Sequence, residues 1–157
     1  MKLYDCFMYN NEDLLLELRL NVLEKYVYKF IIVESCYDHQ GNKKKLNFNL
    51  KKFKKFKDKI KYIILKKFPE NLSNWERENY HRNYLAKGLN KAKNEDLIMI
   101  SDLDEIPNIS NMEVFFDKKF TVFNQKMIYY RFNLLDNSNP TWQGTKICKK
   151  KYLKSPQ

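Results

Sequence analysis

The sequence predicts an α/β fold in which helices flank a mostly parallel central sheet. Two observations carry this prediction. An aromatic strand-like segment, a helical segment and a second apolar segment follow one another within residues 2–34, which is the order of a β-α-β unit with parallel strands. Residues 97–101 form a short uncharged run between acids, as expected for a strand buried on both faces. We expect one domain spanning residues 1–157.

The chain begins with a strand and a helix. Residues 2–9 have the apolar and aromatic content of a first strand. Asn10 and Asn11 offer an N-cap for a helix predicted at about 12–25, which would cover one face of the sheet. The inward stripe of that helix is predicted to consist of Leu15, Leu18 and Val22, widened by Leu14 and Leu23.

The second strand is predicted at residues 28–34. Because the carboxyl ends of parallel strands meet at one edge of the sheet, Glu34 would lie at the same edge as Asp102. The alternative for Glu34 is an ordinary solvated strand end. Residues 35–42 then form a polar loop.

A lysine-rich helix is predicted at about 50–60, followed by a third strand at 61–65. The apolar face of the helix would be formed by Leu50, Phe53, Phe56 and Ile60. This pattern is typical of a solvated amphipathic helix. Because cationic helices with interleaved aromatic residues also bind nucleic acids and membrane surfaces, the stretch between Lys43 and Lys67 is a candidate nucleic-acid patch.

A capping box at residues 73–76 opens a further helix, predicted at about 75–87. Glu78 and Arg82 are four residues apart, which predicts an ion pair on the surface of this helix. The alternative is that Arg77 or Arg82 points at a phosphate group of a ligand.

The strand predicted at residues 96–102 ends in an acidic turn. Asp102, Asp104 and Glu105 crowd three carboxylates together, and Pro107 stops regular pairing. Since adjacent carboxylates repel one another, and since carboxylate oxygens suit hard divalent cations, this turn is a candidate metal site. The alternative is that the acids only terminate a strand and begin a turn.

The last third of the chain is harder to interpret. A second capping box, Ser110 with Glu113, predicts a short helix. Residues 120–132 are dense in β-formers and predict one or two further strands. Residues 137–144 are turn-rich, and we expect no closing element after them.

Composition limits the partners and the compartment. A formal net charge of +11 predicts an anionic partner, but only four of the 30 basic residues are arginine, which disfavours sequence-specific nucleic-acid recognition. Three widely spaced cysteines indicate neither a disulfide framework nor a zinc site, so we expect a reducing, cytoplasmic setting. We expect no signal peptide and no membrane span, because no run of 18 apolar residues occurs.

Several spaced motifs together resemble glycosyltransferase family 17, the β-1,4-mannosyl-glycoprotein 4-β-N-acetylglucosaminyltransferases. The first motifs are Tyr4-Asp5-Cys6-Phe7, Asn11-Glu12, Leu18-Arg19-Leu20 and Phe30-Ile31-Ile32-Val33-Glu34-Ser35 with His39 and Gly41. The later ones are Trp75-Glu76-Arg77-Glu78-Asn79-Tyr80, Arg82-Asn83 and Ile100-Ser101-Asp102-Leu103-Asp104-Glu105-Ile106-Pro107, with Trp142 and Gly144 as a continuation.

The resemblance implies a GT-A-like nucleotide-sugar-binding fold and an inverting, metal-dependent transfer of sugar to a saccharide acceptor. Its donor would be UDP-N-acetylglucosamine, and Mn²⁺ or Mg²⁺ would be held by Asp102 and Asp104 against the diphosphate. The residues expected to help bind the donor are Asn11, Glu12, Glu34, Arg77 and Arg82.

An inverting transfer also needs a general base beside the acceptor hydroxyl, and the candidates are Glu105 and Asp136. The family usually continues well beyond its acidic motif, whereas this chain ends about fifty residues after Asp104, so we expect a short acceptor side. Two other classes remain open. One is a basic nucleic-acid-binding module, and the other is a metal-dependent phosphoryl-transfer enzyme that uses the same acids.

Overall fold

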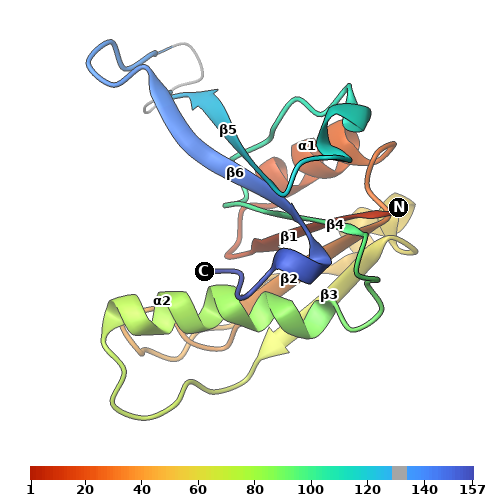
Figure 1. Ribbon diagram of the computed structural model, residues 1–157. Coiled ribbons are helices and arrows are strands. Elements are labelled where there is room, and N and C mark those ends of the chain that lie inside the picture. The colour runs from red at the N-terminus through yellow and green to blue at the C-terminus, as the bar shows by residue number, and fades with distance from the viewer. Residues whose placement is uncertain (129–133) are drawn as a thin grey trace.

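The computed structural model describes residues 1–128 and 134–157, and its strands form one six-stranded sheet in the order β3-β2-β1-β4-β6-β5 (Figure 1). The strands are β1 (Leu3–Met8), β2 (Lys29–Ser35), β3 (Ile60–Leu65), β4 (Leu97–Ile100), β5 (Phe120–Lys126) and β6 (Thr141–Lys149). The first four are parallel, and β6 lies antiparallel between β4 and β5. The prediction of an α/β fold with a mostly parallel sheet is therefore confirmed.

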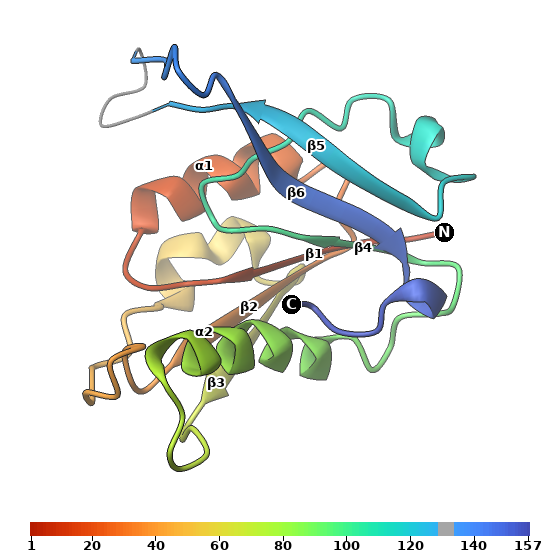
Figure 2. The same ribbon diagram turned by 60° about the vertical axis from the view of Figure 1, so that its left-hand side comes forward.

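Helices cover both faces of the sheet (Figure 2). One face carries α1 (Asp13–Leu23), η1 (Leu50–Phe56) and η3 (Met112–Phe115), and the other carries α2 (Asn74–Asn83) and η2 (Tyr84–Gly88). A short turn, η4 (Lys150–Tyr152), follows β6. Because side chains of a strand alternate, each strand serves both cores. In β1, Leu3 and Phe7 enter the core under α1, and Tyr4 and Cys6 enter the core under η2.

The order of the strands creates a crevice at the carboxyl edge. From β1 the chain moves outward to β2 and β3, and α2 then returns it to β4 on the other side of β1. The loops that follow β1 and β4 therefore diverge. In open α/β sheets, ligands bind at this switch point.

The helix α1 is present where the sequence predicts it, but of the residues predicted on its inward face only Leu23 is fully buried. Leu14, Leu18 and Val22 are exposed, and Leu15 is only partly buried. The buried side chains of α1 are Leu16, Arg19, Leu20 and Leu23. The prediction was wrong because the face of α1 that packs on the sheet contains Arg19. A method that looks for apolar residues at helical spacing does not select a face that contains a charged residue.

The predicted caps of the helices have mixed outcomes. The capping box of Ser73 and Glu76 is present and opens α2. At α1 the N-cap is Glu12, with no capping side-chain bond, so the predicted cap at Asn10 or Asn11 is wrong. The second predicted box is also wrong, because η3 is a single 3₁₀ turn whose N-cap is Asn111 and which has no side-chain cap.

The lysine-rich segment forms the 3₁₀ element η1 rather than a helix reaching residue 60. It is kinked at Phe53, and Ile60 belongs to β3. Phe53 and Phe56 are buried, whereas Leu50 is exposed. Three lysines of the segment bind groups of α1 or the residue after it: Lys52 with Asp13, Lys55 with Asn21 and Lys59 with Glu24. Part of this positive charge therefore holds the segment onto α1.

A strand, β6, lies where the sequence predicts turns and no closing element. Thr141 to Lys149 form β6, which pairs with β4 on one side and with β5 on the other. The turn signals before residue 141 obscured this strand. Of the strands predicted within 120–132, β5 covers Phe120–Lys126, and residues 129–133 lie outside the described residues.

A buried ion pair connects α1 to the centre of the sheet. Nε and Nη2 of Arg19 donate to the two carboxylate oxygens of Asp5, over 2.8 and 2.7 Å, and both side chains are fully buried. Asp5 belongs to β1 and faces α1 between Leu3 and Phe7. Burying two charges is costly unless they are paired and all their hydrogen bonds are satisfied.

The rest of the Arg19 guanidinium holds the turn after β4. Nη1 donates to the backbone oxygens of Asp102, Leu103 and Glu105 over 2.9, 3.0 and 3.1 Å, and Nη2 also donates to Oγ of Ser101. All the N–H groups of the guanidinium are thus used. The conformation of the acidic turn therefore depends on the pair formed by β1 and α1.

Replacing Arg19 with methionine should lower the free energy of unfolding by about 3–5 kcal/mol, because Asp5 would stay buried without its partner. Urea unfolding measures the change. A matched control is Lys67→Met, which removes an ion pair whose side chains are 73% and 80% exposed, and it should change the free energy by less than about 0.5 kcal/mol. Equal midpoints for Arg19→Met and the parent chain would contradict the structural role of the pair.

Candidate active site

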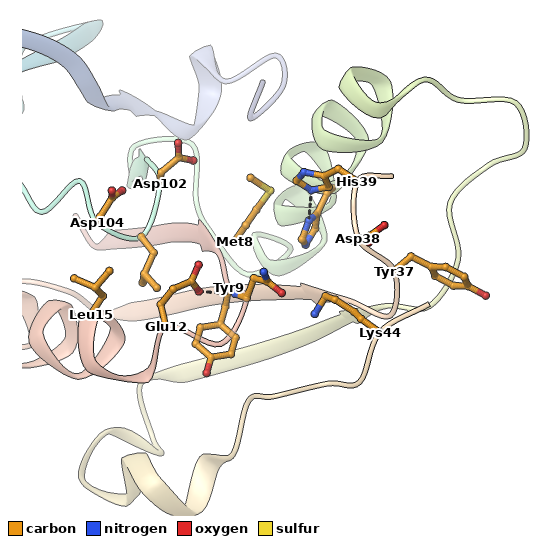
Figure 3. A pocket seen from close by; sticks show the side chains of 13 residues that line it. Met8, Tyr9, Glu12, Leu15, Tyr37, Asp38, His39, Lys44, Asp102 and Asp104 are labelled. Atoms are coloured by element: carbon orange, nitrogen blue, oxygen red, sulfur yellow. Dashed lines mark hydrogen bonds between the residues drawn. The ribbon is translucent and has the colours of Figure 1, made fainter. Parts of the chain in front are cut away.

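A pocket of about 410 Å³ lies at the switch point of the sheet (Figure 3). Five segments line it: the end of β1 with the loop after it, helix α1, the loop after β2, helix α2 and the turn after β4. The lining side chains used below are Glu12, His39, Lys44, His81, Asp102 and Asp104. The pocket thus occupies the place where the fold alone predicts a ligand.

One wall of the pocket is acidic. Asp102 and Asp104 follow β4 and both line the pocket, as the sequence predicts for strand-end acids. Oδ1 of Asp102 accepts a hydrogen bond from Nη1 of Arg82 over 2.8 Å, and its side chain is 48% exposed. Asp104 is exposed, and its carboxylate has no hydrogen-bond partner among the described residues. The two acids therefore differ, since one is held in place and the other is free.

Arg82 forms the predicted ion pair with Glu78 and a second ion pair with Asp102. Its Nη2 lies 3.4 Å from Glu78, which confirms the ion pair four residues apart on α2. Its Nη1 binds Asp102 instead of pointing at an open anion site. This contact directs one oxygen of Asp102 toward the protein and leaves the other for a ligand.

The two acids could hold a divalent ion only together with other ligands. Among residues 1–128 and 134–157, no group of three or more His, Cys, Asp or Glu side chains is arranged to bind a metal. Magnesium-type ions are commonly bound by one or two carboxylates, with substrate phosphates and water completing the shell. A free carboxylate on Asp104 and one free oxygen on Asp102 fit that mode of binding.

The opposite wall of the pocket carries cationic and imidazole groups. Lys44 lines it, with its Nζ 3.1 Å from Oε1 of Glu34, and so does His39 from the same loop. His81 of α2 lies behind His39, and their facing nitrogens, Nε2 of His39 and Nδ1 of His81, are 3.3 Å apart. This histidine pair cannot be predicted from local sequence patterns, because its members are 42 residues apart.

Glu34 lies at the predicted edge, but it is completely buried. Its two oxygens accept hydrogen bonds from four protein groups, namely Nζ of Lys44, the backbone N–H groups of Asn47 and Phe48, and the hydroxyl of Tyr62. Burial and the bond to Glu34 raise the pKa of Tyr62, so the phenol remains a donor. Glu34 can therefore affect ligand binding only indirectly, by positioning the loop that contains Lys44, Asn47 and Phe48.

Of the remaining predicted donor-binding residues, Glu12 lines the pocket, whereas Asn11 and Arg77 do not. Glu12 lines it and accepts a hydrogen bond from the backbone N–H of Asn10 over 2.7 Å. Asn11 adopts a left-handed conformation, with φ of 72°, and is not among the lining residues. Arg77 donates to the backbone oxygen of His39 over 3.2 Å. It therefore supports the histidine loop from outside the pocket.

The two candidate bases are engaged in local hydrogen bonds. Oε2 of Glu105 accepts from the backbone N–H of Asp102 over 2.9 Å, and Oε1 accepts from the indole N–H of Trp142. Asp136 accepts from two backbone N–H groups in the turn before β6 and is not a lining residue. The assignment of either acid as the general base stays a prediction.

Among the residues that the structure describes, no helix has the length and apolar character needed to cross a membrane.

Comparison with known proteins gives a family. A family model described as "Glycosyltransferase family 17" matches residues 1–142. The chain is 30% identical over 108 residues to proteins of Homo sapiens and of Rattus norvegicus, each named beta-1,4-mannosyl-glycoprotein 4-beta-N-acetylglucosaminyltransferase. These alignments cover 62% of this chain but 20% of either relative, so the chain matches about a fifth of their length. No solved structure matches it.

The match covers the loops after β1 and β2, helices α1 and α2 and the acidic turn, all of which line the pocket. It also includes the buried pair of Asp5 and Arg19 that holds the turn. The chain belongs to glycosyltransferase family 17.

Proposed function

We propose that this chain binds a nucleotide sugar and a divalent cation in the pocket at the switch point and takes part in glycosyl transfer to a saccharide acceptor. The observation that carries the proposal is the division of charge in the pocket. A free carboxylate, Asp104, lies on one wall, and Lys44 lies on the other. A metal–diphosphate pair has the same division, because its cation needs oxygen ligands and its phosphates need positive charge.

In the proposed complex, Asp104 and the free oxygen of Asp102 hold Mn²⁺ or Mg²⁺. When bound, the cation supplies Lewis-acid neutralisation of the departing nucleoside diphosphate. Arg82 keeps Asp102 in one orientation, and Arg19 keeps the backbone of the turn in place. Lys44 would donate a hydrogen bond from Nζ to a phosphate oxygen, and its ion pair with buried Glu34 limits its motion.

The finer features of the proposal come from the relatives. Their name specifies N-acetylglucosaminyl transfer, which supports UDP-N-acetylglucosamine as the donor. The β-linkage in that name supports inversion, since such donors carry the sugar in α-linkage. The parallel strands and the acids at their carboxyl edge support a GT-A-like arrangement. The donor, the stereochemistry and the fold family are parts of the proposal.

Isothermal titration with UDP tests the metal site. Affinity for UDP should rise when Mn²⁺ is present, and Asp104→Asn should reduce that gain about tenfold or more, because the amide supplies no charge to the cation. Without metal, the melting temperature of Asp104→Asn should equal or slightly exceed that of the parent chain, since repulsion from Asp102 is relieved.

The matched control for this titration is Asp117→Asn, which neutralises an exposed acid away from the pocket. It should leave the metal-dependent gain unchanged. An equal gain in the parent chain and in Asp104→Asn would remove the metal site from the proposal.

The products formed from UDP-N-acetylglucosamine and Mn²⁺ distinguish glycosyl transfer from phosphoryl transfer. Cleavage between the sugar and the diphosphate yields UDP, whereas attack on phosphorus yields UMP and a sugar phosphate. We expect UDP, whether water or a saccharide is the acceptor, and we expect its formation to be lost in Asp104→Asn. Chromatography of the nucleotides gives the answer, and accumulation of UMP would favour the phosphoryl-transfer alternative.

A further inference from the structure

We propose that His39 binds the anionic diphosphate of the ligand by taking up a proton on Nδ1, and that His81 is a positioning residue that holds the His39 ring. This inference rests on the proposed function and assigns part of the opposite wall of the same pocket. The chain has two histidines, and both line the pocket that contains Asp102 and Asp104 (Figure 3). Neither histidine is a ligand in the proposed cation site, which uses Asp102 and Asp104.

The hydrogen bonds of His81 determine which of its nitrogens carries a proton. Nε2 of His81 lies 3.3 Å from the backbone oxygen of Val33, and a carbonyl oxygen can only accept. Nε2 therefore carries the hydrogen. Burial, followed by the nearby His39, lowers the pKa of His81 to about 4. At neutral pH its Nδ1 is thus an acceptor with a lone pair.

The tautomer of His81 then determines which nitrogen of His39 carries a hydrogen. Nε2 of His39 lies 3.3 Å from Nδ1 of His81, and because that atom accepts, Nε2 of His39 must donate. The remaining nitrogen of His39, Nδ1, has no hydrogen-bond partner among the described residues. Nδ1 is therefore the ring nitrogen of His39 that is left to contact a ligand.

The surroundings direct any added proton to His39 rather than to His81. His81 is almost fully buried, and Lys44 and Arg82 add to the positive potential around it. His39 is more exposed, and the same loop presents Asp38 and Lys44 to the pocket. Across the pocket lie the acids Glu12, Asp102 and Asp104. A cation bound to the last two would offset their charge and leave the phosphates to interact with His39 and Lys44.

Protonated on Nδ1, His39 would have a second N–H group to donate to a phosphate oxygen, while its first N–H group stays on His81. Hydrogen bonds between charged partners are roughly twice as strong as neutral ones. Binding of the anion would therefore favour the form of His39 that carries a proton on Nδ1. Arg77 donates a hydrogen bond to the backbone oxygen of His39 and so helps to position the loop that carries this ring.

Calorimetric titration of UDP-N-acetylglucosamine in the presence of Mn²⁺ tests this inference, because the two phosphates of this ligand do not titrate near neutral pH. At pH 7, the enthalpy for the parent chain should change with the ionisation enthalpy of the buffer, which reports a fraction of a proton taken up per ligand. His39→Gln keeps a donor for His81 but accepts no proton. It should abolish the buffer dependence and weaken binding about tenfold.

Two changes at His81 separate positioning from packing. Gln at this position offers one donor for Val33 and one acceptor for His39, so His81→Gln should retain most of the affinity and the proton uptake. His81→Leu fills the space but accepts nothing, and it should weaken binding to about the level of His39→Gln. Lys43→Gln removes an exposed charge in the same loop, outside the pocket, and should change neither quantity.

Thermal melts and far-UV circular dichroism verify that each variant is folded. If the parent chain binds no UDP-N-acetylglucosamine with Mn²⁺, the proposed function fails and this inference fails with it. If the parent chain binds in a metal-dependent manner but takes up no proton, or if His39→Gln binds equally well, only the role of His39 is overturned.

Discussion

A guanidinium buried between a helix and the centre of the sheet sets the geometry of the candidate active site. Arg19 neutralises Asp5 on β1, and its remaining N–H groups bind Ser101 and three backbone oxygens of the acidic turn. A buried guanidinium is stable only when every N–H group has an acceptor. Any movement of the turn away from Arg19 would leave buried donors unpaired, which is unfavourable, so the conformation of the turn is restricted. The backbone that carries Asp102 and Asp104 is therefore held in one conformation without a ligand.

Several acids cluster at the carboxyl edge, but they perform different tasks. Glu34 and Glu105 accept hydrogen bonds from neighbouring loops and hold those loops together. Asp102 is shared between Arg82 and the pocket, and Asp104 alone presents a carboxylate without a protein partner among the described residues. This division gives the pocket an acidic wall that faces Lys44 and the histidine pair. The same division underlies both the proposed cation site and the proposed phosphate contact.

The sequence predicted the features that depend on neighbouring residues. The apolar runs of β2 and β4 and the capping box of α2 are local patterns, and all three are present. The inward face of α1 was missed because Arg19 is stabilised by Asp5, fourteen residues away. An acid inside a buried strand was a usable signal, since it requires a cation nearby. Partners farther apart, such as β6 with β4 or His39 with His81, leave no pattern that periodicity can detect.

The central claim is that Asp104 shares a divalent cation with the diphosphate of a nucleotide sugar. Anomalous diffraction at the manganese edge, from crystals grown with Mn²⁺ and UDP, locates the cation directly. The account predicts one strong peak within about 2.0–2.6 Å of a carboxylate oxygen of Asp104 and of a phosphate oxygen of the nucleotide. A nucleotide bound in the pocket with no peak beside Asp104, or a manganese peak only elsewhere on the molecule, would contradict it.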